Sequence, residues 1–157
     1  KQYKAIHFTL IGNGPDREQA MRLAQQYGLS NIEFIEWLDK EELIAHVWQA
    51  QVCLGAFGTT PQSMMTVQNK IYESMAMAIP IISGDSPAVR QAFKPGEEIW
   101  LCKREDGAAL AEAILKLWRQ PGLRAGLASN GYRRFKDEYG LAAIGRHFAA
   151  HLREAAG

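Results

Sequence analysis

The feature that most constrains the fold is the regular alternation of short β-type segments with helical segments along the first hundred residues. Apolar runs rich in branched residues predict five strands, the first of them buried, at 6–11, 32–35, 52–57, 81–83 and 98–102. Proline starts, glycine stops and helical spacing predict helices between the strands and from Asp106 onwards. Because strands that alternate with helices form βαβ units, we expect an α/β fold, a Rossmann-like doubly wound parallel sheet with C-terminal helices.

Length and composition limit the classes of protein to which the chain can belong. Its 157 residues are about one domain's worth of polypeptide, and 47% hydrophobic with 22% charged residues is typical of a globular protein. A net charge of +1 argues against a nucleic-acid partner, and no apolar run approaches the roughly 20 residues of a membrane span. Cys53 and Cys102 lie in apolar stretches without metal-ligand spacing, so we expect reduced, buried thiols and a cytoplasmic chain.

The loops at the carboxyl ends of the strands are the candidate site, because ligands of such sheets bind there. These loops are 12–16, 36–39, 57–68 and 83–87. Trp37 lies in the second of them and is a candidate to line a base pocket; the alternative is that it covers the end of the sheet. The polar stretch 58–68 predicts a loop without regular structure.

Two short patterns suggest an anionic ligand. Gly12 and Gly14 follow the first strand as in a dinucleotide fingerprint, but Arg17 stands where its third glycine would be, so a plain tight turn is the alternative. Lys70 lies in the first turn of its helix, where a cation opposes the macrodipole unless an anion binds there. Glu73 follows on the same face and could accept hydrogen bonds from ribose hydroxyls. A simple surface pair of Lys70 with Glu73, worth roughly 0.2–0.5 kcal/mol, explains the spacing equally well.

Other reactive side chains form no recognisable constellation. His147 and His151 are four residues apart but lack a third ligand, so we expect no metal site. Neither Ser63 nor Ser86 has a histidine and an acid arranged around it by any motif. The catalytic residues therefore stay unassigned.

Several segments, in order, resemble the C-terminal, donor-binding domain of GT-B glycosyltransferases, in particular the retaining family 4 type (glycosyl transferases group 1). Residues 10–15 (LIGNGP) are similar to the family's strand and turn "l-v-G-x-G-p". Residues 70–82 (KIYESMAMAIPII) resemble "K-x-y-E-a-m-A-x-G-x-P-v-i", the most specific element. Residues 32–43 match the family's segment "v-x-f-x-G-x-v…e-e-l", and residues 106–118 match the helix that follows its last strand.

The resemblance implies roles for individual residues. Glu73 matches the second glutamate of the family's E-x7-E motif, which hydrogen-bonds the nucleotide ribose. The two glycines would lie beside the nucleotide, the loop around Trp37 would meet the base, and the helix start near Asn69 would face the diphosphate. The expected site residues for the nucleotide are Gly12, Gly14, Trp37, Leu38, Asn69, Lys70 and Glu73.

The sequence also departs from the family pattern. Met65 stands where the first glutamate of E-x7-E would hold the donor sugar, although some members use a lysine in a "p-x-K-x-y-E" form that Lys70 fits. Ala78 replaces the usual glycine before the proline. The family's first strand of this domain, its following helix and the whole acceptor domain would lie upstream of Lys1. We therefore expect residues 1–157 to be a single donor-binding domain, inactive as an isolated fragment.

The function that the resemblance implies is retaining transfer of a sugar from a nucleotide-diphosphate donor, of UDP or GDP type, to a hydroxyl acceptor. No cofactor or metal is implied, because positive groups and a helix dipole stabilise the departing diphosphate. The acceptor would bind the N-terminal domain, the full-length enzyme would associate peripherally with a membrane, and bacterial cell-surface polysaccharide synthesis is the expected setting. Two alternatives stay open: a non-catalytic nucleotide-binding or interaction module, and a sugar-nucleotide epimerase.

Overall fold

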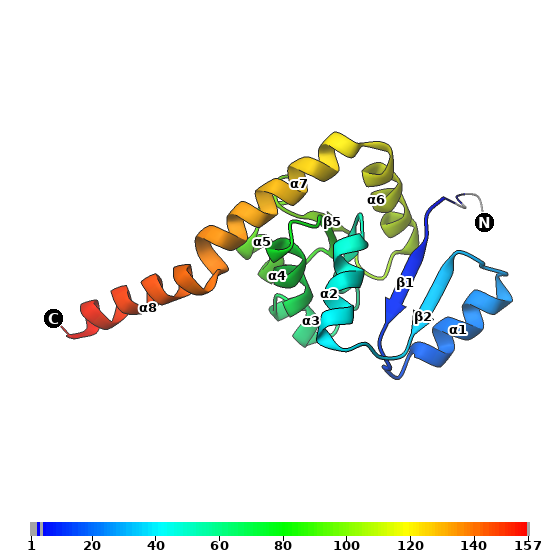
Figure 1. Ribbon diagram of the computed structural model, residues 1–157, viewed down its shortest axis with the longest axis horizontal. Helices are drawn as coiled ribbons and strands as arrows, with labels where there is room; N and C mark the ends of the chain where they lie inside the picture. Colours follow the sequence, from blue (N-terminus) through cyan, green and yellow to red (C-terminus); the bar gives the residue numbers. More distant parts are fainter. Residues whose placement is uncertain (1–2, 4, 157) are drawn as a thin grey trace. The chain divides into compact units, whose positions relative to one another are not determined.

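The computed structural model describes Tyr3 and residues 5–156, which divide into two compact units. Unit 1 is Lys1–His46 and unit 2 is Val47–Gly157. Figure 1 shows the elements of both units along the chain. None of the described helices is both long enough and apolar enough to cross a membrane.

Unit 1 contains a pair of parallel strands and the helix that connects them. Its elements are β1 (Phe8–Ile11), α1 (Arg17–Gln26) and β2 (Ile32–Ile35), and α2 (Lys40–Gln49) leads on into unit 2. The register pairs Phe8 with Ile32 and Ile11 with Ile35. The polypeptide leaves α1 at Gly28, whose φ of 59° is the left-handed conformation that favours glycine after a helix.

Unit 2 holds a parallel sheet in the order β3-β4-β5 and most of the helices. Its strands are β3 (Cys53–Leu54), β4 (Ile81–Gly84) and β5 (Trp100–Cys102). Between them lie α3 (Pro61–Met65), α4 (Asn69–Ala76) and α5 (Pro87–Ala92). After β5 come α6 (Gly107–Arg119), α7 (Pro121–Arg134), the π-helical turn η1 (Phe135–Tyr139) and α8 (Leu141–Ala156).

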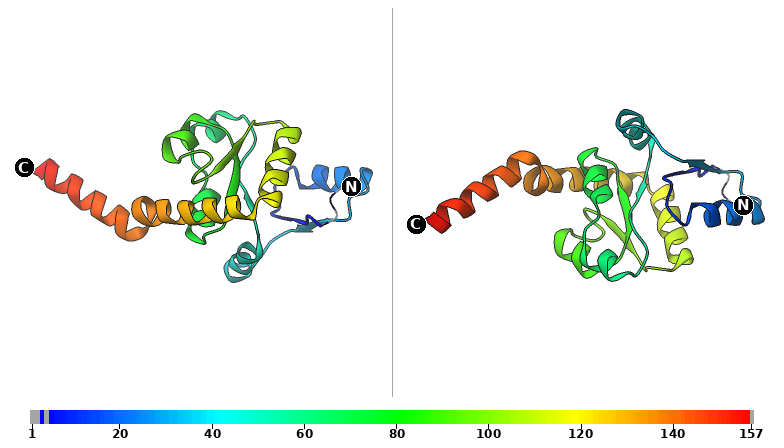
Figure 2. Two further views of the ribbon diagram at one scale, coloured as in Figure 1. Left: turned by 90° about the horizontal axis from the view of Figure 1, so that it is seen from above. Right: turned by 90° about the horizontal axis from the view of Figure 1, so that it is seen from below.

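Helices cover both faces of the unit 2 sheet, as Figure 2 shows. Ile81 packs in one cluster with Met75 of α4 and Val89 of α5. The next residue, Ile82, packs in the other cluster with residues of α6 and α7. Since successive strand residues point to opposite faces, this alternation confirms a doubly wound arrangement in unit 2.

The structure confirms the α/β class and all five expected strands, and corrects four details. The strands make two parallel sheets, β1-β2 and β3-β4-β5, because their backbone hydrogen bonds form two separate ladders. The first strand is not buried: Leu10 is 43% and Ile11 36% exposed, because unit 1 supplies few apolar neighbours. The stretch 58–68 contains a helix, α3, started by Thr60 and Pro61. Of the two free cysteines, Cys102 is buried but Cys53 is only half-buried.

Candidate functional site

The predicted residues of unit 1 lie where β1 and β2 end. The Gly12 amide donates to the Ile35 carbonyl (2.9 Å), which extends the strand pairing into the glycine turn. The Asn13 side chain then donates to the Glu36 carboxylate (2.9 Å). These bonds hold the turn that contains Gly12 and Gly14 next to the loop that contains Trp37 and Leu38.

The backbone and exposure of these residues fit a surface that can receive a ligand. Gly12 has a φ of 143°, a conformation that a residue with a side chain rarely adopts. Space for a Cβ is open at both Gly12 and Gly14 among the described atoms. Trp37 is 75% exposed, which argues against the interpretation that it covers the end of the sheet. A large exposed indole offers a stacking face to a planar group.

The predicted residues of unit 2 lie on α4. Asn69 and Lys70 form its first turn and Glu73 follows one turn later, all with exposed side chains. Lys70 and Glu73 make no ion pair with each other among the contacts of the described residues, so the simple surface pair is absent. Both groups are thus available to a ligand.

The start of α4 also lacks a side-chain cap. Gln68 occupies the N-cap position in an extended conformation, but its side chain makes no capping hydrogen bond. Instead its Nε2 donates to the carbonyls of Ser63 (3.3 Å) and Thr66 (3.0 Å), and its buried Oε1 has no partner among the described atoms. First-turn N–H groups without a side-chain acceptor are typical of an anion-binding helix start.

Met65 ends α3 and is 78% exposed. Met65, at the position of the family's sugar-binding glutamate, is therefore on the surface, next to the segment that leads into α4. A thioether cannot replace a carboxylate as a hydrogen-bond acceptor for sugar hydroxyls.

One buried charge escaped the sequence analysis. Arg104, two residues after β5, is only 8% exposed, and its guanidinium donates to backbone carbonyls in the segments 58–63 and 84–85. The only signal in the sequence is a basic residue just beyond a strand, in the run Lys103-Arg104-Glu105-Asp106, and such a run usually forms a solvated surface. Its partners lie 19 to 46 residues away in the sequence, so no local pattern reveals them.

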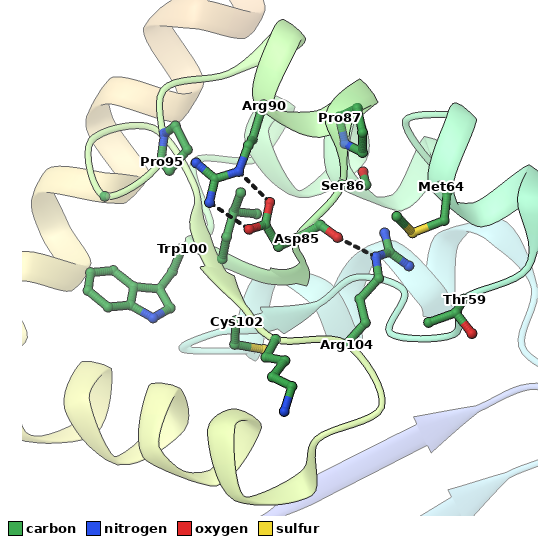
Figure 3. Close-up of a pocket in the computed structure, with 13 residues that line it drawn as sticks. Thr59, Met64, Asp85, Ser86, Pro87, Arg90, Pro95, Trp100, Cys102 and Arg104 are labelled. Atoms are coloured by element: carbon green, nitrogen blue, oxygen red, sulfur yellow. Dashed lines mark hydrogen bonds and ion pairs between the residues drawn. The ribbon is translucent and has the colours of Figure 1, made fainter.

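An open pocket of about 900 Å³ lies beside β5, and residues of the segment 85–90 together with Thr59 and Met64 also line it (Figure 3). Arg90 and Asp85 form a two-pronged ion pair on its wall (Nη2–Oδ2 2.5 Å), and this hydrogen bonding raises the pKa of Arg90. The seven predicted residues are absent from the described lining of this pocket.

The nearby thiols are not activated as nucleophiles. Burial raises the pKa of the Cys102 thiol, with a further contribution from the Asp106 carboxylate. Burial also raises the pKa of Cys53. Both thiols are thus protonated at neutral pH, and the thiolate is the reactive form. No group of three or more metal-ligating side chains occurs in the part of the chain that the structure describes.

The chain is similar to several known proteins. Residues 1–120 match the family model described as glycosyl transferases group 1. A Salmonella typhimurium protein named as a colanic acid biosynthesis glycosyltransferase, WcaL, is 26% identical over 117 residues. That match covers 73% of this chain and 29% of the relative, so the chain spans less than a third of its length.

Solved structures share the fold. Sucrose-phosphate synthase from Thermosynechococcus elongatus superposes with a TM-score of 0.76 at 25% identity, over 95% of this chain and 39% of that one. The Anabaena protein HepE, solved in complex with UDP, gives a TM-score of 0.78 at 17% identity, over 95% of this chain and 41% of that one. The C-terminal domain of a group 1 glycosyl transferase (LpcC) from Francisella tularensis gives a TM-score of 0.72 at 20% identity, over 89% of this chain and 73% of that one.

Proposed function

Because the chain belongs to the glycosyl transferases group 1 family, we propose that it is the donor-binding part of a glycosyltransferase whose site takes a nucleotide-diphosphate sugar. The family match confirms the resemblance seen in the sequence, and the likeness to solved glycosyltransferases confirms the fold of the GT-B type. We further propose that residues 1–157 act as one donor-binding domain, and that the rest of the full-length protein binds the acceptor.

The start of α4 carries this proposal. It combines first-turn N–H groups that no side chain caps with an exposed cation at Lys70 and an exposed carboxylate at Glu73. Peptide N–H groups and Lys70 suit the diphosphate, while Glu73 suits the ribose hydroxyls. HepE, whose structures contain UDP and UDP-glucose, supports a uridine nucleotide as the first donor to try.

The residues of this chain would contribute to the reaction by electrostatic stabilisation. The bond between the sugar C1 and the phosphate oxygen breaks, the nucleoside diphosphate leaves with the electron pair, and the acceptor hydroxyl oxygen bonds to C1 as its proton passes to the leaving phosphate oxygen. Negative charge grows on the leaving diphosphate, where Lys70 and the α4 start, with Asn69, would stabilise it. Transfer with retention, as in family 4, is part of the proposal.

Unit 1 would receive the nucleoside. The turn with Gly12 and Gly14 lets a ligand approach the backbone closely. The Trp37 indole and the backbone of Leu38 would meet the base. A cytoplasmic location, peripheral membrane association and a part in cell-surface polysaccharide synthesis are proposals for the full-length enzyme, the last supported by the colanic acid relative.

A non-catalytic nucleotide-binding module is the second candidate, and Met65 favours it. If the exposed thioether of Met65 cannot bind the sugar, nucleotide sugars should bind no more tightly than the nucleotides alone. The comparison of a nucleotide with its sugar conjugate separates the two candidates.

Thermal shift of the full-length protein with UDP, GDP, ADP and their sugar conjugates tests the proposal. The correct nucleotide should stabilise the fold by RT ln(1 + [L]/Kd). Glu73→Ala should weaken its binding about tenfold or more, since a hydrogen bond to a charged group is worth about 1.5–3 kcal/mol. Glu112→Ala, an exposed glutamate on α6, is the matched control and should leave binding unchanged. The absence of a shift with every nucleotide would refute the donor-site proposal.

A further inference from the structure

Arg104 is buried without a carboxylate partner. Its Nε donates to the Asp85 carbonyl (2.7 Å), its Nη2 donates to the carbonyls of Gly84 (3.2 Å) and Ser63 (3.1 Å), and its Nη1 donates to the Gly58 carbonyl. All three guanidinium nitrogens are thus in use. Figure 3 shows the side chain between Asp85 and the loop after β3. Among the described residues its hydrogen bonds go to backbone carbonyls and one hydroxyl, and none to a carboxylate.

Burial of an unpaired charge is costly unless every proton finds an acceptor. Four carbonyl dipoles supply the acceptors here, and the guanidinium fork is the side chain that can meet several acceptors at fixed angles. The sequence also makes room for it: a Cβ on Gly84 would lie 2.6 Å from Cγ of Arg104 and 2.7 Å from the Ala56 carbonyl oxygen. Arg104 and Gly84 therefore form one packed arrangement.

The same side chain is linked to the start of α4. The Ser63 carbonyl accepts from Nη2 of Arg104 (3.1 Å) and also from Nε2 of Gln68 (3.3 Å), the N-cap residue of α4. The Ser63 hydroxyl donates to the Gly58 carbonyl (2.6 Å), which Arg104 also contacts. These hydrogen bonds, from Arg104 to Ser63 and from Ser63 to Gln68, thus connect the end of β5 to the residue that precedes Asn69.

We propose that Arg104 is a positioning residue that sets the diphosphate-binding start of α4 by holding the segment 58–65 in place. This inference rests on the proposed function, because it concerns the part of the donor that α4 would meet. Arg104 does not touch the donor, since its protons are committed to backbone carbonyls. Its effect is geometric, so a lysine, which keeps the charge but lacks the fork, should not replace it.

The test compares Arg104→Lys with wild type in the full-length protein, using UDP and UMP, and GDP and GMP in parallel. The diphosphate should bind about tenfold more weakly to the variant, whereas the monophosphate should lose less than about twofold, because the lost positioning acts on the terminal phosphate. Amide hydrogen exchange of ligand-free protein should rise in 58–68 and stay unchanged in β4. Arg133→Lys, at an exposed arginine of α7, is the matched control and should change neither readout.

A second variant guards against simple misfolding. Ser63→Ala keeps Arg104 and adds no atoms but removes the hydroxyl that donates to the Gly58 carbonyl (2.6 Å), so it should lower the ratio of diphosphate to monophosphate affinity in the same direction. An unchanged ratio in Arg104→Lys, with or without a change in melting temperature, would overturn the positioning role while leaving the proposed function intact. A wild-type protein that binds none of the four nucleotides would overturn the proposed function, and the role of Arg104 towards a donor with it.

Discussion

Ala78 has a backbone conformation that usually belongs to glycine, with a φ of 55°. It follows α4 in a Schellman motif, in which the Ile79 amide donates to the Ser74 carbonyl and the Ala78 amide to the Met75 carbonyl (both 3.0 Å). The family pattern has glycine at this position, and the left-handed φ explains why. We expect Ala78→Gly to stabilise unit 2 by roughly 0.5–1 kcal/mol, because relief of about 1–2 kcal/mol of strain exceeds the backbone entropy that glycine adds.

Thermal unfolding of wild type and variant measures this gain as a higher melting temperature. Ala111→Gly is the control, since Ala111 is exposed within α6 and a glycine there should cost about 1 kcal/mol. Equal destabilisation by both glycines would show that the φ of Ala78 carries no strain.

At the scale of the element, helix starts were the most predictable feature. The sequence pattern Asp39-x-x-Glu42 forms a capping box at α2: the Glu42 amide donates to Asp39 Oδ1 (2.8 Å), and the Asp39 amide donates to Glu42 Oε2 (3.2 Å). Such signals lie within four residues, so a single sequence contains them. The helix α3 was missed although Thr60 and Pro61 begin it, because the polar composition of 58–68 outweighed that local signal.

Arg104 and the exposure of β1 could not be predicted, for a different physical reason. Which carbonyls meet the guanidinium depends on loops that lie up to 46 residues away. The apolar run of β1 has the same composition as a buried strand, and its exposure depends on how many elements pack on it. In the candidate site, the exposed first turn of α4 can be predicted from the sequence. The contacts that we propose position this turn cannot be predicted from it.

Asp106 links helix capping to pH. It caps α6 by accepting from the Ala109 amide (3.0 Å), which, with the Lys103 ammonium 3.2 Å away, holds the pKa of this carboxyl below its ordinary 3.8. The folded-state pKa is depressed, so the stabilisation is present above about pH 3.8 and is lost as pH falls through the folded value. Asp106→Asn keeps a capping oxygen but cannot titrate.

The melting temperature of Asp106→Asn should therefore lie below that of wild type at pH 7, and the gap should close as the pH falls below the ordinary pKa of 3.8. Asp16→Asn is the control at pH 7, because the Asp16 side chain makes no capping bond to α1. A gap of constant size over this fall in pH would contradict the role of the Asp106 charge.

At the scale of the molecule, the two units differ in how much core they possess. Among the described residues, Ala24 is the one buried apolar residue of unit 1, whereas all four residues of β4 in unit 2 are buried. Local opening costs least where few apolar contacts must be broken. Amide hydrogen exchange of the 157-residue chain should therefore show faster exchange in β1 and β2 than in β4 and β5, although all four strands are hydrogen-bonded. The turn with Gly12 and Gly14, which we propose meets the nucleotide, lies in the unit with the smaller core. Protection of β1 equal to that of β4 would mean that unit 1 draws its stability from contacts other than its own core.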